Sequence, residues 1–530
     1  MTHRTSAAPD PARQFLRGAA AWTLALGGGA ALGLTALHLA GPSGGLPAMA
    51  ALAAAPAAAS RGTPWLDAQG QANAETRAFL ALLRRAGEHG LDPAAYRIDA
   101  IETALADDPA AATALLDETI AAYARDLTVP QRLAEVIYID PELVPAPPTL
   151  AALTAQGTPV AALEALQSGN LAYQELRAAL ADYRARWGHL PQVTIPQGPT
   201  LAPGSRGARV ALLRERLGLP EGTSYDTALG QAVLAFRAAH GLPPARLADA
   251  ATIAALNKGA AGYEALILAD LDRLRALPAD GRRHVLADTA AARLRMIEGG
   301  REAGSMRVVV GKPGMATPLL AGLIRYALVN PYWNVPPDLV RATIAPAVLR
   351  EGPGMLARRR YVLSPDWRST APLDPGAVDW QAVAAGRASV WVRQLPGGRN
   401  MMGRVKFMLP NDMGIYLHDT PDKTLFTRAD RRLSSGCVRV EDAARLGAWL
   451  FGRDILAGDP APDRRVDLEE PVPVYTLRLN TGVERGRVRF RSEGLDGGEP
   501  SPPHLPPRHG ATKTDRSVHI KEPSAQQSAH

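Results

Sequence analysis

The sequence predicts a multidomain α+β protein, with helical domains first and a mostly β domain after them. Its 530 residues exceed the length of a typical single domain. Apolar residues recur at the spacing of amphipathic helices through most of residues 63–257. From His284 onward the period changes to the alternation expected of strands. A helix-forming half therefore precedes a sheet-forming half.

Residues 1–60 are typical of an export segment. Three arginines precede an uncharged stretch at 18–45, which is the order found in a signal sequence or signal anchor. Its apolar part is about twenty residues long, enough to cross a bilayer, whereas three consecutive glycines and His38 weaken it as a membrane helix. The Ala-rich residues 48–60 offer cleavage sites. A cleaved signal, a retained anchor and a buried Ala/Gly helix all stay open.

Residues 63–190 are expected to form a helical scaffold. Phe79, Leu82 and Leu83 share one helical face, and Gly90 marks the end of that helix. Later segments repeat the pattern after a Pro-rich break. The segment contains no cluster of groups that would carry chemistry.

Residues 200–258 predict a compact three-helix module. Two amphipathic helices are followed by Gly241, a typical helix stop, and an Asp cap opens the third helix. Residues 262–283 then predict a separate linking helix. Four arginines of the module are either contacts for anionic groups or a solvated helix face: Arg206, Arg209, Arg214 and Arg237.

Residues 284–478 predict the mostly β domain. Residues 345–390 interrupt its strand pattern and are expected to form an inserted cap of helix and loops. A buried strand, GIYLH, ends at His418. The tail at 479–530 is rich in Pro, Gly, Ser and charge, and we expect it to be disordered.

Charge and cysteine content restrict the class of partner. The formal net charge of +7 and the pI of about 9.6 suit an anionic partner. The sequence has no long basic run interleaved with aromatic residues, so nucleic acid is not expected. One cysteine allows neither an internal disulfide nor a zinc cluster. No metal, nucleotide or organic cofactor is expected.

Cys437, the sole cysteine, lies nineteen positions after His418. A free thiol is mostly protonated near neutral pH, so a catalytic cysteine needs a base or a positive neighbour, and histidine suits that role. Ser434, Ser435 and Gly436 precede the thiol and favour a tight turn whose amides can face an oxyanion. The alternative is a small buried cysteine.

The phrases HDTP and SSGCVR around His418 and Cys437 resemble the YkuD-type L,D-transpeptidase catalytic domain. The resemblance implies Cys437 as nucleophile, His418 as general base and acid, and the backbone carbonyl of Asp419 as the group that orients the imidazole. Many members of the family have a second histidine where this chain has Ser435. The oxyanion role then belongs either to Ser435 or to backbone amides of the turn, Gly436 included.

Other phrases extend the resemblance over most of residues 65–475. Residues 63–190 resemble the helical scaffold domain of large L,D-transpeptidases, and residues 200–258 resemble a peptidoglycan-binding module. VVVGKP…TP and NPYWNVPP resemble the first half of the catalytic domain. In large members, an insertion like the one at 345–390 forms a flexible cap over the active site.

The implied reaction releases D-Ala from tetrapeptide stems through a thioester on Cys437 and forms 3→3 cross-links. Peptidoglycan stem peptides are thus the expected partners, with wall-synthesis proteins as further ones and the membrane reached only through the N-terminal segment. Six residues are predicted to bind substrate, with turn packing or plain surface charge as the alternative for most of them: Tyr332, Trp333, Asn334, Arg404, Tyr416 and Arg439.

Several alternatives stay open at this stage. A D-amino acid, water or a lysine of an outer-membrane protein can take the thioester in place of a second stem. A wall-binding scaffold with an impaired site, and a hydrolytic thiol peptidase, are the rival classes. The expected location is the periplasm or cell envelope.

Overall fold

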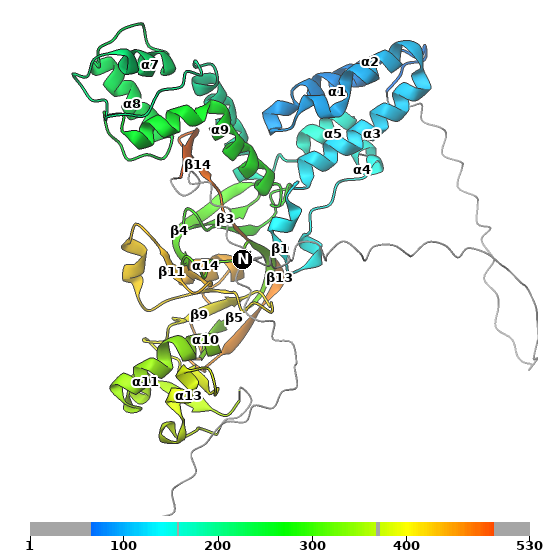
Figure 1. Ribbon diagram of the computed structural model, residues 1–530. Coiled ribbons are helices and arrows are strands. Elements are labelled where there is room, and N and C mark those ends of the chain that lie inside the picture. The colour runs from blue at the N-terminus through cyan, green and yellow to red at the C-terminus, as the bar shows by residue number, and fades with distance from the viewer. Residues whose placement is uncertain (1–64, 156–157, 367–370, 492–530) are drawn as a thin grey trace, which may run out of the picture. The chain divides into compact units, whose positions relative to one another are not determined.

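The computed structural model describes residues 65–155, 158–366 and 371–491 (Figure 1). The predicted export segment lies outside the described residues. Within the described ranges, no helix combines the length and the apolar character needed to span a membrane.

The scaffold region is helical, as its periodicity predicts, but its last helix belongs to another core. Side chains of Asn73, Asp108 and Asn170 cap α1, α3 and α6. Helices α1–α5 share one apolar core, whereas Tyr173 and Leu176 of α6 pack into the core of the next module. The helices are α1 Ala74–Arg84, α2 Ile98–Asp107, α3 Pro109–Thr128, α4 Leu150–Ala155, α5 Pro159–Ala165 and α6 Leu171–Tyr183.

Strand β1, Ile137–Tyr138, was not predicted in this region. It pairs in parallel with β5 and so joins the sheet of the following domain. Short 3-10 segments connect the helices of the scaffold region: Ala86–His89, Pro93–Tyr96, Leu133–Glu135 and Pro141–Leu143, with a π turn at Arg184–Gly188.

The three-helix module consists of α7 Ala208–Arg216, α8 Thr227–Ala239 and the first part of α9 Ala250–Leu274. The predicted linking helix is continuous with the third helix and not separated from it. Gly259, with φ of 77°, makes a kink between the two parts. A left-handed φ is readily adopted by glycine, so the chain bends here without a loop.

Arg214 and Arg237 stabilise the module through the same pair of contacts, each with a proline carbonyl and an aspartate. Arg214 donates to the Pro220 carbonyl and pairs with Asp226 at 2.8 Å. Arg237, 23 positions later, donates to Pro243 and pairs with Asp249 at 2.8 Å. Both guanidiniums are buried. The prediction that these two arginines contact wall carboxylates or lie on a solvated helix face is therefore wrong, because each pairs with a carboxylate of its own module and closes a loop there.

The β domain is a 10-stranded sheet. Its order is β1-β5-β13-β2-β3-β4-β12-β10-β9, and a further β5–β9 pairing closes it on itself, while β11 pairs with β4. An apolar core fills this sheet, with α14 Ala443–Phe451 packed on it. The remaining strands are β2 His284–Asp288, β3 Arg293–Glu298, β4 Arg301–Gly311, β5 Leu320–Val329, β9 Val405–Met408, β10 Leu417–His418, β11 Arg432–Ser434, β12 Val438–Val440 and β13 Arg464–Leu477.

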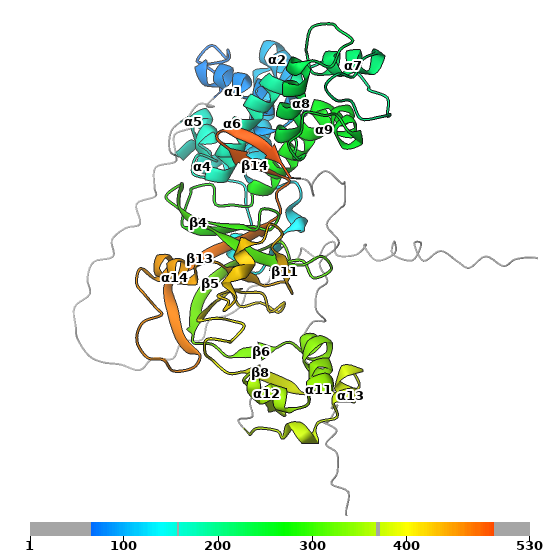
Figure 2. The ribbon, with the colours of Figure 1, turned by 90° about the vertical axis from the view of Figure 1, so that its left-hand side faces the viewer.

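The insertion is larger than the predicted 345–390. The first and last strands of the insertion along the chain, β6 Trp333–Val335 and β8 Trp391–Gln394, pair with each other, so it runs from 333 to 394 (Figure 2). It has a three-stranded sheet and an apolar core of its own. Sequence alternation placed the segment around β8 in the main sheet, which is wrong. The other elements are α10 Pro337–Leu339, a π turn Val340–Ile344, α11 Ala345–Glu351, α12 Gly354–Arg358, β7 Tyr361–Ser364, a 3-10 turn Pro375–Ala377 and α13 Trp380–Ala384.

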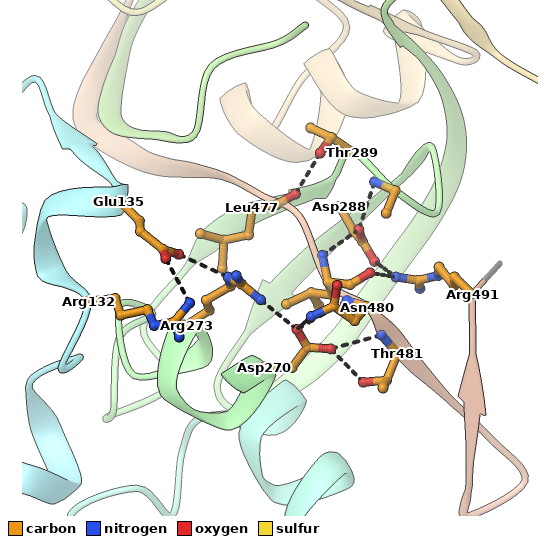
Figure 3. A network of polar contacts seen from close by, with 12 residues as sticks. Arg132, Glu135, Asp270, Arg273, Asp288, Thr289, Leu477, Asn480, Thr481 and Arg491 are labelled. Atoms are coloured by element: carbon orange, nitrogen blue, oxygen red, sulfur yellow. Dashed lines mark hydrogen bonds and ion pairs between the residues drawn. The ribbon is translucent and has the colours of Figure 1, made fainter. Parts of the chain in front are cut away.

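The expected disorder from 479 is wrong for the described part of the tail. β14 Thr481–Glu484 and β15 Arg487–Phe490 form a hairpin. Its turn contains Arg485 and Gly486 at positive φ, and Phe490 stacks on His240 at 5.5 Å. Buried Asp270 of α9 accepts hydrogen bonds from Asn480 and Thr481 (Figure 3). The apolar side chains of this segment are too few to reveal such packing in the sequence.

Candidate active site

Two neighbouring strands bring the predicted pair together. β10 ends at His418, and β12 begins one residue after Cys437. The strands run in parallel, with Leu417 opposite Val438 and His418 opposite Arg439. The amide of Val438 donates to the carbonyl of Tyr416 at 3.2 Å, so this register fixes the thiol beside the end of β10.

His418 is a neutral base in this environment. Its side chain is 2% exposed, and ring Nδ1 lies 2.5 Å from the carbonyl oxygen of Asp419. A carbonyl oxygen only accepts, so Nδ1 carries the proton and Nε2 keeps its lone pair. Burial, then the charge of Arg439, lower the pKa of His418 to about 3, although the Asp419 carbonyl acts the other way.

Cys437 is partly exposed and is the thiol rather than the thiolate. Its Sγ donates to the Gly414 carbonyl at 3.5 Å. Burial raises the pKa of Cys437, while hydrogen bonding from Tyr416 and the charge of Arg439 oppose that rise. A neutral thiol needs a base to take its proton, and the neutral imidazole on the neighbouring strand can accept it.

Ser434 builds the turn that leads into Cys437. Its hydroxyl donates to the Cys437 carbonyl at 2.6 Å and accepts from the Gly436 amide at 3.2 Å. Gly436 has φ of 120°, in the region that favours glycine. The predicted Gly436 amide is therefore occupied within the turn, whereas the Ser435 side chain is exposed. Ser434 was not among the predicted site residues, although SSGC contains it.

Thr317 supports the same turn from the loop between β4 and β5. Its hydroxyl accepts from the Gly311 amide at 2.9 Å and donates to the Gly436 carbonyl at 2.7 Å. The side chain is 6% exposed. Sequence reasoning noted the TP phrase that contains this residue but gave it no role, because its partner is 119 positions away.

Asp419 positions the base through both its backbone and its side chain. The carboxylate accepts from the Arg404 amide at 2.9 Å and pairs with Lys423 at 2.6 Å. A side chain at Gly403 would collide with that carboxylate. The structure thus contains the predicted contact between the Asp419 carbonyl and His418, and the Asp419 carboxylate is itself held by Arg404 and Lys423.

The six predicted substrate-binding residues divide into two groups. Tyr416 and Arg439 lie at Cys437, and the Tyr416 ring is 5.7 Å from that of His418. Tyr332 reaches the site through its carbonyl, which accepts from buried Lys406 at 3.3 Å. The other three make their contacts elsewhere: Trp333 packs near Tyr361 of the cap, Asn334 accepts from Arg393, and the Arg404 side chain is exposed. Lys406 was missed because the alternation of β9 predicted only a half-buried strand.

Sequence comparison assigns the domain that holds this geometry. Residues 282–462 match the model of the L,D-transpeptidase catalytic domain, YkuD. The chain carries a YkuD-type L,D-transpeptidase catalytic domain. Residues 57–180 match a model described as a scaffold domain.

Individual proteins resemble parts of the chain. A curated protein of Haemophilus influenzae that carries the L,D-transpeptidase name is 32% identical over 225 residues. The match covers 41% of this chain and 44% of that protein, so the chain spans less than half of its length.

Solved structures add little beyond these sequence matches. An L,D-transpeptidase from Xylanimonas cellulosilytica is 17% identical, covers 53% of this chain and all of that one, and has a TM-score of 0.17. A mutant of the Enterococcus faecium L,D-transpeptidase is 10% identical, covers 38% of this chain and 52% of that one, and has a TM-score of 0.19. Scores this low do not bear on the assignment, which stands on the sequence matches.

A pocket adjoins the turn before Cys437. Its volume is about 290 Å³, and Thr317, Gly311 and Arg432 line it together with Glu135 of the scaffold region. Neither Cys437 nor His418 contributes to its wall. Among the described residues, no group of three or more His, Cys, Asp or Glu side chains is placed to hold a metal ion.

Proposed function

We propose that the protein is a peptidoglycan L,D-transpeptidase that forms 3→3 cross-links through a thioester on Cys437. The observation that carries the proposal is the Nδ1 contact of His418 with Asp419 at 2.5 Å. It leaves Nε2 as a proton acceptor on the strand that adjoins the nucleophile. The domain match supports this reaction class.

In the first step, the sulfur of Cys437 attacks the carbonyl between the L-centre of diaminopimelate and the terminal D-Ala. The thiol proton moves to His418 and then to the amine of the leaving D-Ala, so a C–S bond replaces the C–N bond. In the second step, the side-chain amine of another stem attacks the thioester. Its proton passes through His418 to the departing sulfur, which restores the thiol. The covalent intermediate divides one amide exchange into two steps.

The turn before Cys437 supplies the oxyanion donors in this proposal. The Ser435 side chain is exposed, and within the described part of the chain its hydroxyl has no hydrogen-bond partner that would occupy it. In comparable hydrolases, one hydrogen-bond donor aimed at the oxyanion stabilises the transition state by about 3–4 kcal/mol. Ser434 and Thr317 hold this turn and thereby fix the direction of any donor on it.

The remaining regions fit a wall-directed role. We assign residues 200–258 to contact with the wall polymer, in line with their resemblance to a peptidoglycan-binding module and with the net charge of +7. Residues 1–60 would export the chain to the periplasm or cell envelope. Acceptor choice among a stem amine, a D-amino acid, water or a protein lysine is set by the shape of the groove beside the thioester.

The decisive experiment compares the soluble protein with its Cys437→Ala variant on disaccharide-tetrapeptide, followed by mass spectrometry. We expect D-Ala release and a 3→3 cross-linked dimer with the native protein and neither with the variant. D-Ala release with tripeptide monomer alone would favour water as acceptor. If neither protein changes the substrate and both bind intact sacculi, the wall-binding scaffold replaces the enzyme as the better interpretation.

A further inference from the structure

Two cations flank His418 within the sheet of the transpeptidase domain. His418 of β10 lies opposite Lys406 of β9 on one side and opposite Arg439 of β12 on the other. Directly opposed residues on neighbouring strands project from the same face of a sheet, so these side chains form a row. The adjacent register positions belong to the apolar core: Leu417, Phe407 and Val438.

Neither cation has a carboxylate partner within the described ranges. Lys406 is 8% exposed, and its ammonium donates to the Tyr332 carbonyl at 3.3 Å and lies 5.6 Å from the centre of the Tyr416 ring. The Nε of Arg439 is buried and lacks a hydrogen-bond partner. The described ion pairs of this region join other residues, such as Lys423 with Asp419.

Buried unpaired cations are costly, because a charge removed from water needs an opposite charge or several hydrogen bonds in return. Burial lowers the pKa of both Lys406 and Arg439, which is the signature of that cost. Two carboxylates face the row, Asp463 near Lys406 and Asp422 near Arg439, but among the described residues neither forms an ion pair with these cations. Asp463 accepts from the Tyr332 amide, and Asp422 accepts from the amide and hydroxyl of Thr424. The other charged and titratable groups that face Lys406 are Cys437, Arg393, Tyr416, His418 and Arg439. An anion from outside the chain would satisfy this row.

We propose that Lys406 and Arg439 form a carboxylate subsite beside Cys437 that holds the terminal D-Ala carboxylate of the donor stem. The inference rests on the proposed function and names the part of the substrate that this row recognises. In the donor, one carbon atom separates that carboxylate from the nitrogen of the bond to be cleaved. A cation that touches the carboxylate must therefore lie near the nucleophile, and the charges of both Arg439 and Lys406 act on the Cys437 thiol.

The same contact would prepare the base. Positive charge from Arg439 and Lys406 contributes to the low pKa of His418. A bound carboxylate offsets that charge, so the pKa of His418 rises when the donor is in place. The imidazole is then a stronger proton acceptor with the correct substrate than in the free enzyme. A donor that ends in a carboxamide loses both the contact and this activation.

The test compares two tetrapeptide donors, one with a terminal carboxylate and one with a terminal carboxamide, by kcat/KM for release of the last residue. The native protein should prefer the carboxylate by about tenfold to a hundredfold, the value of a charge-assisted hydrogen bond. Lys406→Met should remove most of this preference by slowing the carboxylate donor far more than the carboxamide donor. Lys406→Arg, which keeps the charge, should restore much of it. Lys312→Met removes an exposed lysine of the same domain and should change neither donor.

Two results would overturn the subsite. One is equal use of both donors by the native protein. The other is an equal loss for both donors in Lys406→Met, together with a shift of Cys437 alkylation to higher pH, since Lys406 would then serve the thiolate. If the native protein releases no D-Ala at all, the proposed function fails, and the subsite is judged by binding of both peptides to Cys437→Ala. Preference for the acid peptide that Lys406→Met abolishes supports it, and equal binding rejects it.

Discussion

Burial keeps both members of the Cys437–His418 pair uncharged in the free protein. It lowers the pKa of His418 to about 3 and raises that of the thiol above its ordinary range. The imidazole is therefore neutral at working pH, and near neutral pH the sulfur is mostly the protonated thiol. In the proposed reaction, the thiol proton would pass to the imidazole as the sulfur attacks. This neutral pair differs from the preformed thiolate–imidazolium pair that gives some cysteine enzymes their reactivity at neutral pH.

The pH profile of thiol alkylation distinguishes these two states. Because only the thiolate reacts and its pKa is raised, the rate constant should increase about tenfold per pH unit from pH 6 to 8. No inflection from His418 should occur in this range, since its pKa lies near 3. Iodoacetamide incorporation measured by mass spectrometry reports on this one site, because Cys437 is the sole cysteine. A plateau that starts between pH 6 and 7 would indicate a preformed ion pair.

Thr317 and Thr420 form a matched pair for testing the support of the turn. Both are buried, yet the Thr317 hydroxyl makes two hydrogen bonds and the Thr420 hydroxyl makes none among the described residues. Thr317→Val leaves a buried amide and a carbonyl unpaired, at about 1–3 kcal/mol. We expect a lower Tm and slower D-Ala release for Thr317→Val, and an unchanged or higher Tm for Thr420→Val. Equal effects in both variants would show that the turn does not depend on Thr317.

The separation of two contacting residues along the chain decides whether the sequence can predict their contact. Cys437, His418 and Asp419 can be identified from the sequence because each lies in a short motif. Lys406 and Thr317 reach the site by strand pairing and by a hydrogen bond across 119 positions. Such partners follow from the register of the sheet, which a single sequence with only strand-like alternation does not specify.

At the scale of elements, the local spacing of apolar residues predicts whether a segment is a helix or a strand better than it predicts which sheet or core that segment joins. Alternation predicts that the segment of β8 is a strand, but its assignment to the main sheet is wrong, because alternation does not specify the neighbouring strand. β8 belongs to the sheet of the cap. The hairpin β14–β15 was missed for a related reason. Its few apolar residues, including Val488 and Phe490, are buried by distant α6, α8 and α9 rather than by each other. High local polarity therefore hid a segment that tertiary contacts order.

Asp270 provides the test of that hairpin. The carboxylate is fully buried, and its contacts with Asn480, Thr481 and Arg273 are all made to donors. Asp270→Asn turns an amide donor toward some of these groups, and breaking a buried charged network costs about 3–5 kcal/mol. We expect faster amide hydrogen exchange at residues 481–490. Glu484→Gln breaks only an exposed pair with Arg489 and should leave exchange unchanged.

An unchanged exchange rate in Asp270→Asn would show that aromatic packing alone orders the hairpin. Phe490 then becomes the residue to change, because its ring contacts His240, Tyr183 and Tyr263.

At the scale of the whole molecule, the chain is a series of modules whose connections are structurally distinct. The scaffold region contributes β1 to the transpeptidase sheet, so the two regions share hydrogen bonds. The cap, in contrast, shares no strand pairing with that sheet within the described ranges, and it has its own core. Trp333 pairs directly with Gln394, which places the two ends of the cap side by side. The architecture therefore predicts that the cap can be removed while β1 cannot.

Replacing residues 333–394 with a short Gly/Ser linker tests this division. Lys406 keeps its contact with the Tyr332 carbonyl, and Asn400 keeps its contact with Pro331. The variant should remain folded, with Cys437 alkylated by iodoacetamide at close to the native rate. D-Ala release from tetrapeptide stems should fall at least tenfold, because the cap carries Arg393, whose positive charge acts on Lys406 of the proposed carboxylate subsite. Its guanidinium lies 5.1 Å from the Tyr332 ring. Arg393→Gln alone should give a smaller fall. Unchanged D-Ala release would restrict the cap to a structural role. An unfolded variant would show that the transpeptidase domain needs the cap core for its own folding stability.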